Sequence, residues 1–238
     1  MTPMKAAILA AGQGERLRAG GFTQPKPLVP VAGTPLIDYA VGAIAAAGLR
    51  DVACIVNEQS HGIEAHCRER WPEVRFEFVR RTTPSSMESL FTLGPLLGAG
   101  RFVLLTVDAI YAPGGLRDFI AAAARHADAH GVLAVSDFVE DEKPLWVRLA
   151  ADARITALGD PARDSGMVTA GFYVFDAAIF AEVDDARAQR FTALRQFLAH
   201  LLARGYRVYG TRVPKTVDVD RPEDIASAAA FVRSGFAG

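Results

Sequence analysis

The sequence lacks the features that mark several classes of protein. It has only two cysteines, Cys54 and Cys67, in 238 residues, which excludes a disulfide framework. Its 26 lysines and arginines nearly balance 27 aspartates and glutamates. The net charge of −1 therefore gives no electrostatic case for binding nucleic acid or an anionic membrane surface. Apolar runs such as Ala43–Ala47 are short and rich in alanine, and are too short to span a bilayer.

The residues that are present indicate one globular unit with a large core. Half of them are hydrophobic, and the mean hydropathy is slightly positive at +0.16. The segment Met1–Lys5 leads directly into an apolar run and leaves no room for a signal peptide. We therefore expect a cytoplasmic domain covering residues 1–238, with no membrane partner.

The first half of the chain alternates between strand-like and helix-like segments. Such alternation predicts an α/β fold with a mostly parallel sheet covered on both faces. The expected strands are Ala6–Leu9, Val52–Val56, Phe76–Val79 and Phe102–Val107, and the expected helices are Pro35–Gly48, Ser86–Leu97 and Gly115–Ala129. Thr34 followed by Pro35 suits a helix N-cap and first position.

The pattern changes after about residue 130. Four strand-like segments follow in quick succession, which predicts a small antiparallel extension beside the parallel core. They are Val132–Val135, Trp146–Leu149, Arg154–Leu158 and Thr169–Phe175. A helix over Thr192–Ala203, a strand over Arg207–Arg212 and a terminal helix complete the chain. Asp220 with Glu223 three residues later fits a capping box at the start of that last helix.

A glycine loop with two nearby cations is the clearest functional signal. The strand ending at Leu9 runs into Gly12 and Gly14, followed by Arg16 and then Lys26 between two prolines. Glycines let backbone N–H groups approach an anion closely, and two cations can neutralise a triphosphate. The alternative is a plain glycine turn with two solvated cations.

This segment resembles a known family. LAAGQGERL followed by PKPLVPVAGTPLI is similar to the signature of the nucleotidyltransferases that join an NTP to a sugar 1-phosphate or another phosphorylated alcohol. LLTVDAIY, VTAGFYVFD and TVDVDRPEDI resemble the later blocks of this family, in the same order, so the likeness covers nearly the whole chain. It implies a Rossmann-like three-layer αβα sandwich, with a nucleotide-binding half at about 1–130 and an acceptor-binding half at about 131–238. Relatives often form dimers, so a homodimer is an open alternative.

The reaction implied by the resemblance needs little from a protein nucleophile. A phosphate oxygen of the acceptor attacks the α-phosphorus of the NTP and pyrophosphate leaves. A phosphate monoester is already largely ionised near neutral pH, since its second pKa is about 6. Cations and Mg²⁺ are needed to bring the two anions together. Arg16 and Lys26 are the expected catalytic cations, and Gly12 and Gly14 are expected to wrap the phosphates.

Two aspartates are the expected metal ligands. Asp108 follows the apolar run FVLLTV, at the carboxyl end of a strand, where ligands bind in open α/β sheets. By resemblance Asp108 matches the catalytic, metal-binding aspartate of the family, and Asp218 matches the second ligand for Mg²⁺. The alternatives are a cap on the next turn for Asp108 and a strand-end charge for Asp218. Asp220 is predicted to be structural.

The nucleotide base is expected to contact two loops. By resemblance these are the backbone of the first loop, at Leu9, Ala10 and Ala11, and the loop that contains Ser85 and Ser86. The serine hydroxyls either meet a pyrimidine edge or cap the following helix. The helix SSMESLFTL is similar to one in cytidylyltransferases acting on phosphocholine or inositol phosphate, which favours CTP.

The acceptor side carries a weaker signal. Thr169, Ala170 and Gly171 match an acceptor-contacting element of the family. The alternative is an ordinary buried strand with a glycine bulge, which would have the same sequence pattern. Many relatives have glycine where this chain has Val107. Sugar-nucleotide relatives also carry an EKP element where this chain has Gly159-Asp160-Pro161, so their acceptor-binding lysine is missing. Arg148, Arg163 and Lys215 are the candidate substitutes, whereas Lys143 lies too early in the sequence.

The sequence thus predicts an Mg²⁺-dependent nucleotidyltransferase that joins an NTP to a small phosphorylated acceptor, with no nucleic acid partner. Two alternatives stay open. One is a molybdopterin-type cofactor nucleotidyltransferase, which the PKPLVPVAGTPLI spacing disfavours. The other is a non-catalytic nucleotide-sensing module, because a fold and a loop do not establish turnover.

Overall fold

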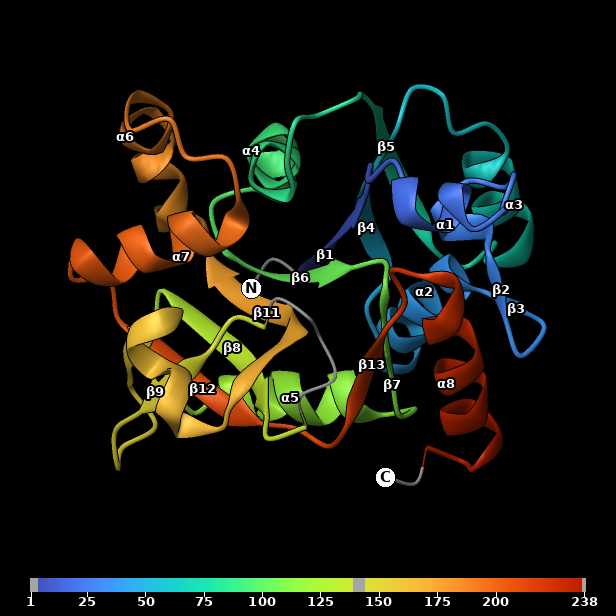
Figure 1. Ribbon diagram of the computed structural model, residues 1–238. Coiled ribbons are helices and arrows are strands. Elements are labelled where there is room, and N and C mark those ends of the chain that lie inside the picture. The colour runs from blue at the N-terminus through green and yellow to red at the C-terminus, as the bar shows by residue number, and fades with distance from the viewer. Residues whose placement is uncertain (1–3, 139–143, 237–238) are drawn as a thin grey trace.

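A seven-stranded sheet lies at the centre of the computed structural model, which describes residues 4–138 and 144–236 (Figure 1). Its strand order is β12-β8-β11-β6-β1-β4-β5. The bounds are β1 Lys5–Ala10, β4 Asp51–Val56, β5 Arg75–Arg80, β6 Arg101–Thr106, β8 Gly131–Ser136, β11 Val168–Asp176 and β12 Val208–Arg212. β11 runs antiparallel to both of its neighbours, and the other neighbouring pairs are parallel. The predicted α/β class with a mostly parallel sheet is confirmed.

Three two-stranded ribbons accompany this sheet. They pair β2 Pro30–Val31 with β3 Thr34–Pro35, β7 Ala109–Tyr111 with β13 Thr216–Asp218, and β9 Val147–Leu149 with β10 Ile155–Leu158. Of the segments predicted as an antiparallel extension, only β9 and β10 lie outside the main sheet. β8 and β11 instead extend the main sheet itself, where β11 pairs antiparallel with both β6 and β8. Periodicity identifies a strand but not the strand with which it pairs.

Helices cover both faces of the sheet (Figure 1). The α-helices are α1 Glu15–Ala19, α2 Leu36–Ala46, α3 Ile63–Arg70, α4 Ser86–Leu97, α5 Gly115–Ala123, α6 Val183–Ala188, α7 Leu194–Ala203 and α8 Pro222–Arg233, with 3₁₀ turns η1 Lys26–Leu28, η2 Asp160–Ser165 and η3 Ala177–Glu182. Ala6 and Ile8 of β1 pack in the core shared with α2 and α5, whereas Ala7 and Leu9 pack in the core shared with α4 and α7. Successive side chains of a strand point to opposite faces, so a strand covered on both sides is apolar throughout.

Several helix ends differ from the predictions, among them the start of α7 at Leu194 rather than Thr192 and the end of α2 at Ala46 rather than Gly48. Pro35 itself takes the N-cap position of α2 without a side-chain cap, because Thr34 is held in the β2–β3 ribbon. α5 ends at Ala123, six residues before the predicted Ala129. α4 has the predicted bounds.

The strand order creates a crevice at one edge of the sheet. From β1 the chain continues to β4 and β5 on one side, and it then returns to β6 on the other side of β1. Ligands of open α/β sheets bind beyond the carboxyl ends of the strands at such a reversal. The glycine loop follows β1 and Asp108 follows β6, so both lie at this edge. Over residues 4–138 and 144–236, no helix is both long and apolar enough to cross a membrane.

Candidate active site

Asp108 and Asp218 meet at the carboxyl end of β6. Beyond Thr106 the chain passes through Val107 and Asp108 into β7, which pairs with β13 so that Asp218 lies opposite Ala109. The backbone N–H of Val219 donates to the carbonyl oxygen of Asp108 at 3.0 Å. A ribbon between segments more than 100 residues apart therefore brings the two predicted metal ligands to one place, and both line one cavity.

Lys26 lies between two carboxylates. Its Nζ donates to Asp108 Oδ2 at 2.8 Å and to Asp220 Oδ1 at 2.5 Å, and its side chain is only 7% exposed. Burial alone would lower the pKa of Lys26, but the charges of Asp108 and Asp220 outweigh it and hold the pKa above its ordinary value. Burial would likewise raise the pKa of Asp108, but the Lys26 charge and hydrogen bond lower it. The site thus holds the charged ammonium of Lys26 beside the ionised carboxylate of Asp108.

Asp220 belongs to this cluster, which corrects the predicted role of a helix cap. Besides Lys26, its carboxylate accepts from Arg16 at 3.3 Å. The N-cap of α8 is instead Arg221, and the carboxylate of Asp224, three residues later, accepts from the backbone N–H groups of Asp220 and Arg221. The predicted capping box was displaced by one residue, and this displacement directs the side chain of Asp220 toward Lys26.

The glycine loop is held tightly against Lys26. Gly14 has a left-handed conformation with φ of 63°, and a Cβ there would lie 2.9 Å from the Cβ of Lys26. Only glycine adopts this positive φ without strain and leaves room for the Lys26 side chain. On the other side, the side-chain amide of the buried Asn57 donates to the carbonyl oxygen of Ala11 at 3.2 Å. Asn57 was missed in the sequence, where its only signal is a polar residue directly after β4.

A cavity of about 330 Å³, here called the loop cavity, opens beside this loop. Lys26 and Asp108 both line it. So do most of the predicted nucleotide-binding residues, namely Leu9, Ala11, Gly12, Ser85 and Ser86. Ala10 is fully buried, and neither it nor Gly14 lines the cavity. The hydroxyl of Ser85 accepts from the backbone N–H of Glu88 at 3.3 Å, so it caps α4 while facing the cavity.

A second cavity of about 350 Å³, here called the α7 cavity, shares Ser86, Thr106 and Asp108 with the first. Thr169, Gly171 and Asp218 line its far side. A third cavity, of about 270 Å³, adjoins it through Thr169, Asp218 and Asp220, and Arg16 lines this one rather than the loop cavity. The carboxylates of Asp108, Asp218 and Asp220 therefore stand between neighbouring cavities. This arrangement can bring two ligands together.

The predicted glycine bulge is present in β11. Its register against β8 shifts between Thr169 and Tyr173, and Gly171 has φ of 80°. A Cβ at Gly171 would lie 2.7 Å from the Cβ of Ala109 and 3.8 Å from Oδ1 of Asp218. The bulge lets the backbone pass close to the metal-ligand candidates, and the carbonyl oxygen of Gly171 accepts from Thr106 at 3.2 Å.

The predicted substitutes for the missing lysine lie away from the α7 cavity. Arg148 pairs with Asp164, and Lys215 lies 3.8 Å from the ring centroid of Phe138. Neither these two nor Arg163 lines the α7 cavity, and Lys143 lies outside the described residues. Among the described residues, the cation that lines this cavity is Arg195, in the first turn of α7. The sequence analysis missed it because no motif surrounds it.

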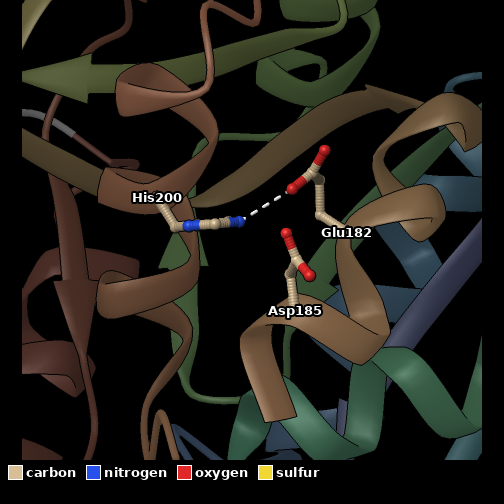
Figure 2. A group of neighbouring side chains, drawn as sticks. All are labelled: Glu182, Asp185 and His200. Carbon is tan, nitrogen blue, oxygen red and sulfur yellow. Dashed lines mark hydrogen bonds and ion pairs between the residues drawn. The ribbon is translucent and has the colours of Figure 1, made fainter. Parts of the chain in front are cut away.

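Another charged group lies in the helical layer on the α4–α7 face. Figure 2 shows Glu182, Asp185 and His200, whose ligand atoms lie within 4.8 Å of one another. Nε2 of His200 and Oε2 of Glu182 are 2.8 Å apart. Arg204 also contacts this group, at 3.2 Å from Glu182 and 4.0 Å from Asp185. This guanidinium already supplies the positive charge that a bound cation would provide.

The fold and the strand-end site together define an open α/β protein with a candidate ligand site at a topological reversal of its sheet. The chain belongs to the Nucleotidyl transferase family, which matches residues 5–235. The family resemblance read from the sequence is thereby confirmed, and the chain is a member of an enzyme family.

The individual relatives share only limited sequence identity with this chain. The chain is 28% identical over 218 residues to a "CMP-5'-(3-aminopropyl)phosphonate synthase" of Streptomyces rubellomurinus, covering 87% of this chain and 33% of the relative. It is 35% identical over 129 residues to a "Bifunctional IPC transferase and DIPP synthase" of Rubrobacter xylanophilus, covering 49% of this chain and 28% of the relative. The chain thus spans about a third of the length of these relatives or less.

Solved structures share the fold. The inositol-1-phosphate CTP transferase of T. maritima superposes with a TM-score of 0.81 at 19% identity, covering 100% of this chain and 99% of that chain. A putative glucose-1-phosphate thymidylyltransferase from Bacillus anthracis superposes with a TM-score of 0.84 at 18% identity, covering 97% of this chain and 96% of that chain.

Proposed function

We propose that this protein transfers a nucleotidyl group from an NTP to a phosphorylated alcohol or sugar and releases pyrophosphate. The observation that carries the proposal is the position of Lys26 between Asp108 and Asp220, at the strand ends where the loop cavity meets the α7 cavity. A charged ammonium held there can neutralise a triphosphate without reorganising during the reaction.

In the proposed reaction, an oxygen of the acceptor phosphate forms a bond to the α-phosphorus of the NTP. The bond from the α-phosphorus to the bridging oxygen breaks, and the electron pair leaves with pyrophosphate. The glycine loop and Lys26 hold the triphosphate in the loop cavity, and Arg16 neutralises charge from the third cavity. The acceptor occupies the α7 cavity beside Thr169 and Gly171. Ala170 between them is buried in the core and lines none of the three cavities.

Asp108 and Asp218 are the proposed ligands of Mg²⁺. Both offer the oxygen donors that this ion prefers, and the β7–β13 ribbon brings them together beside the cavity. When bound, the ion would spread the negative charge that develops across the phosphates. Glu182, Asp185 and His200 fit it less well, because Arg204 already contacts both carboxylates there.

CTP is the proposed nucleotide. The names of the Streptomyces relative and of the T. maritima structure refer to CMP and CTP. The similarity of the α4 segment to cytidylyltransferases points the same way. Because the chain also resembles a putative glucose-1-phosphate thymidylyltransferase, dTTP and the other nucleotides should be tested beside CTP.

Pyrophosphate release, measured with each NTP against a panel of phosphorylated sugars, alditols, choline and inositol, tests the proposal. We expect turnover with at least one pair, loss of turnover when EDTA removes Mg²⁺, and loss in Asp108→Asn. The matched control is Asp118→Asn on α5, an exposed carboxylate that pairs with Arg117. Wild-type rates in Asp108→Asn, or binding of an NTP with no turnover for any acceptor, would overturn the assignment and favour a sensing module.

A further inference from the structure

One buried side-chain amide connects the end of β4 to the glycine loop. Asn57 directly follows β4, which pairs in parallel with β1 so that Val56 lies opposite Ala10. The residue is only 2% exposed, and its Nδ2 donates to the carbonyl oxygen of Ala11 at 3.2 Å. A buried amide that lacks a partner costs free energy, so this bond is strongly favoured over an unpaired arrangement.

The orientation of the Asn57 amide is fixed by its other partners. Its Oδ1 accepts from the backbone N–H of Gln59 at 2.9 Å, which closes a turn of the Asx type. The hydroxyl of Thr82 donates to the same oxygen over a longer distance of 3.4 Å. Rotating the amide by 180° would place its oxygen against the carbonyl oxygen of Ala11 and its NH₂ group against the N–H of Gln59. Only the observed orientation pairs donors with acceptors on both sides.

The bond to Asn57 sets the direction of the peptide group between Ala11 and Gly12. In a planar trans peptide, the C=O of one residue and the N–H of the next point in opposite directions. Because the Ala11 carbonyl is turned toward Asn57, the N–H of Gly12 points away from it. Ala11 and Gly12 line the loop cavity and Asn57 does not, so the side away from Asn57 is the cavity side. Among residues 4–138 and 144–236, no protein group accepts a hydrogen bond from this N–H.

The parts of the loop on either side of this peptide have their own anchors. The carbonyl oxygen of Leu9 accepts from the N–H of Val107 at 3.3 Å, and that of Gly14 accepts from the N–H of Arg18 at 3.0 Å. Between them, a Cβ at Gly12 would meet no atom within 4 Å. Open space and a glycine allow the peptide group to rotate, so one side-chain bond can decide its direction.

We propose that Asn57 is a positioning residue, which turns the Ala11–Gly12 peptide so that the N–H of Gly12 donates to a phosphate oxygen of the bound NTP. Asn57 itself lines none of the three site cavities. A donor whose direction is fixed before the anion binds costs no reorganisation when the hydrogen bond forms. This inference rests on the proposed function, because it concerns the triphosphate side of the same site.

Asn57→Ser tests the role of the bond to Ala11. The serine hydroxyl can still accept from the N–H of Gln59 and keep the turn, but it is too short to reach Ala11. Loss of one hydrogen bond to a charged group should raise the KM for CTP about 10- to 100-fold. The kcat and the KM for the acceptor should change little. Asn57→Thr, which fills more of the vacated space, is a second variant with the same expected result.

The matched control is Thr82→Val, which removes the longer bond to the same amide oxygen and leaves the bond to Ala11 in place. Its KM for CTP should stay near that of the wild type. Urea denaturation of each variant shows how far the substitution affects folding. A lower free energy of unfolding with an unchanged KM for CTP in the Asn57 variants would mean a structural role only. That result, or an equal rise in KM in Thr82→Val, would overturn the proposal.

Calorimetric titration with CTP or inorganic tripolyphosphate, in the presence of Mg²⁺, separates this inference from the proposed function. A similar loss of affinity for both ligands in Asn57→Ser supports the inference even if no acceptor is converted, in which case only the proposed function fails. An unchanged affinity for tripolyphosphate would show that the N–H of Gly12 does not serve a phosphate, and would defeat the inference alone.

Discussion

Two charged clusters in this protein have similar chemistry and different surroundings. At the strand ends, Lys26 bonds to Asp108 and Asp220. In the helical layer, Glu182 bonds to His200 and Arg204. The first cluster borders three cavities, so a ligand can exchange with its ion pairs.

The second cluster is satisfied by its own neighbours. The phenol of Tyr206 donates to Glu182 at 3.1 Å, and the side-chain amide of Gln189 lies 3.3 Å from Nδ1 of His200. The two clusters contain similar residue types. What distinguishes a cluster suited to catalysis from one that holds helices together is therefore whether it borders a cavity and whether its charged groups are already hydrogen-bonded within the protein. The four predictions below test this comparison.

Lys26→Met should have the largest effect. Removing a preorganised cation beside the triphosphate should lower kcat by about a hundred- to a thousandfold. Because the carboxylates it leaves behind are 29% and 44% exposed, the free energy of unfolding should change much less. Steady-state kinetics and urea denaturation measure the two quantities. Lys5→Met, which removes a partner of Glu77, should leave kcat unchanged.

His200→Leu should produce the opposite pattern. The variant leaves the buried Glu182 without its imidazole partner, which should lower the free energy of unfolding by about 2 kcal/mol. The kcat should stay close to that of the wild type, because the cluster borders none of the three site cavities. The matched control in urea denaturation is Asp185→Asn at the exposed edge of the cluster. A loss of kcat with unchanged stability would reverse the roles assigned to the two clusters.

Gly171→Ala tests how closely the bulge of β11 approaches the site. Both Gly171 and Gly166 have positive φ, but only Gly171 would bring a Cβ to 2.7 Å from another Cβ, whereas Gly166 has open space. We expect Gly171→Ala to be less stable than Gly166→Ala by about 1 kcal/mol or more, measured by urea denaturation. Equal losses would mean that the backbone conformation, and not the close approach, requires glycine at residue 171.

The smallest effect is a pH dependence of stability. Burial would raise the pKa of Glu182, but hydrogen bonds from His200 and Tyr206 and the charge of Arg204 lower it below the ordinary 4.5. A carboxylate with a lowered pKa stabilises the fold above its unfolded pKa, and this contribution is lost as the pH falls through the folded value. As the pH falls from about 5 to below 4.5, Glu182→Gln should therefore lose less stability than the wild type. Parallel curves for the two proteins would contradict this assignment.

Local features of the sequence predicted much of the nucleotide side. Short apolar segments in the sequence predicted β1 and β6. Because neighbouring parallel strands have their carboxyl ends at the same edge of the sheet, the position of Asp108 directly after β6 predicted that it lies at this edge. The proximity of Lys26 to Gly14 followed from one contiguous motif. These features depend on periodicity and on short-range spacing, which a single sequence displays.

The remaining features depend on tertiary packing. Asp220 is 194 residues from Lys26, and a shift of one position in the α8 cap decides whether its side chain reaches that lysine. Arg195 lines a cavity only because tertiary packing brings the first turn of α7 to the same cavity as residues of β11. The pairing of β8 and β11 with the main sheet also involves distant segments, and strand periodicity contains no information about it.

A crystal structure with Mn²⁺ and a non-hydrolysable CTP analogue would test the central claim most directly, because anomalous scattering locates the ion. The account predicts an anomalous peak that both Asp108 and Asp218 coordinate, with the triphosphate against the glycine loop and Lys26. A peak confined to Glu182, Asp185 and His200, or a triphosphate bound away from Lys26, would contradict it.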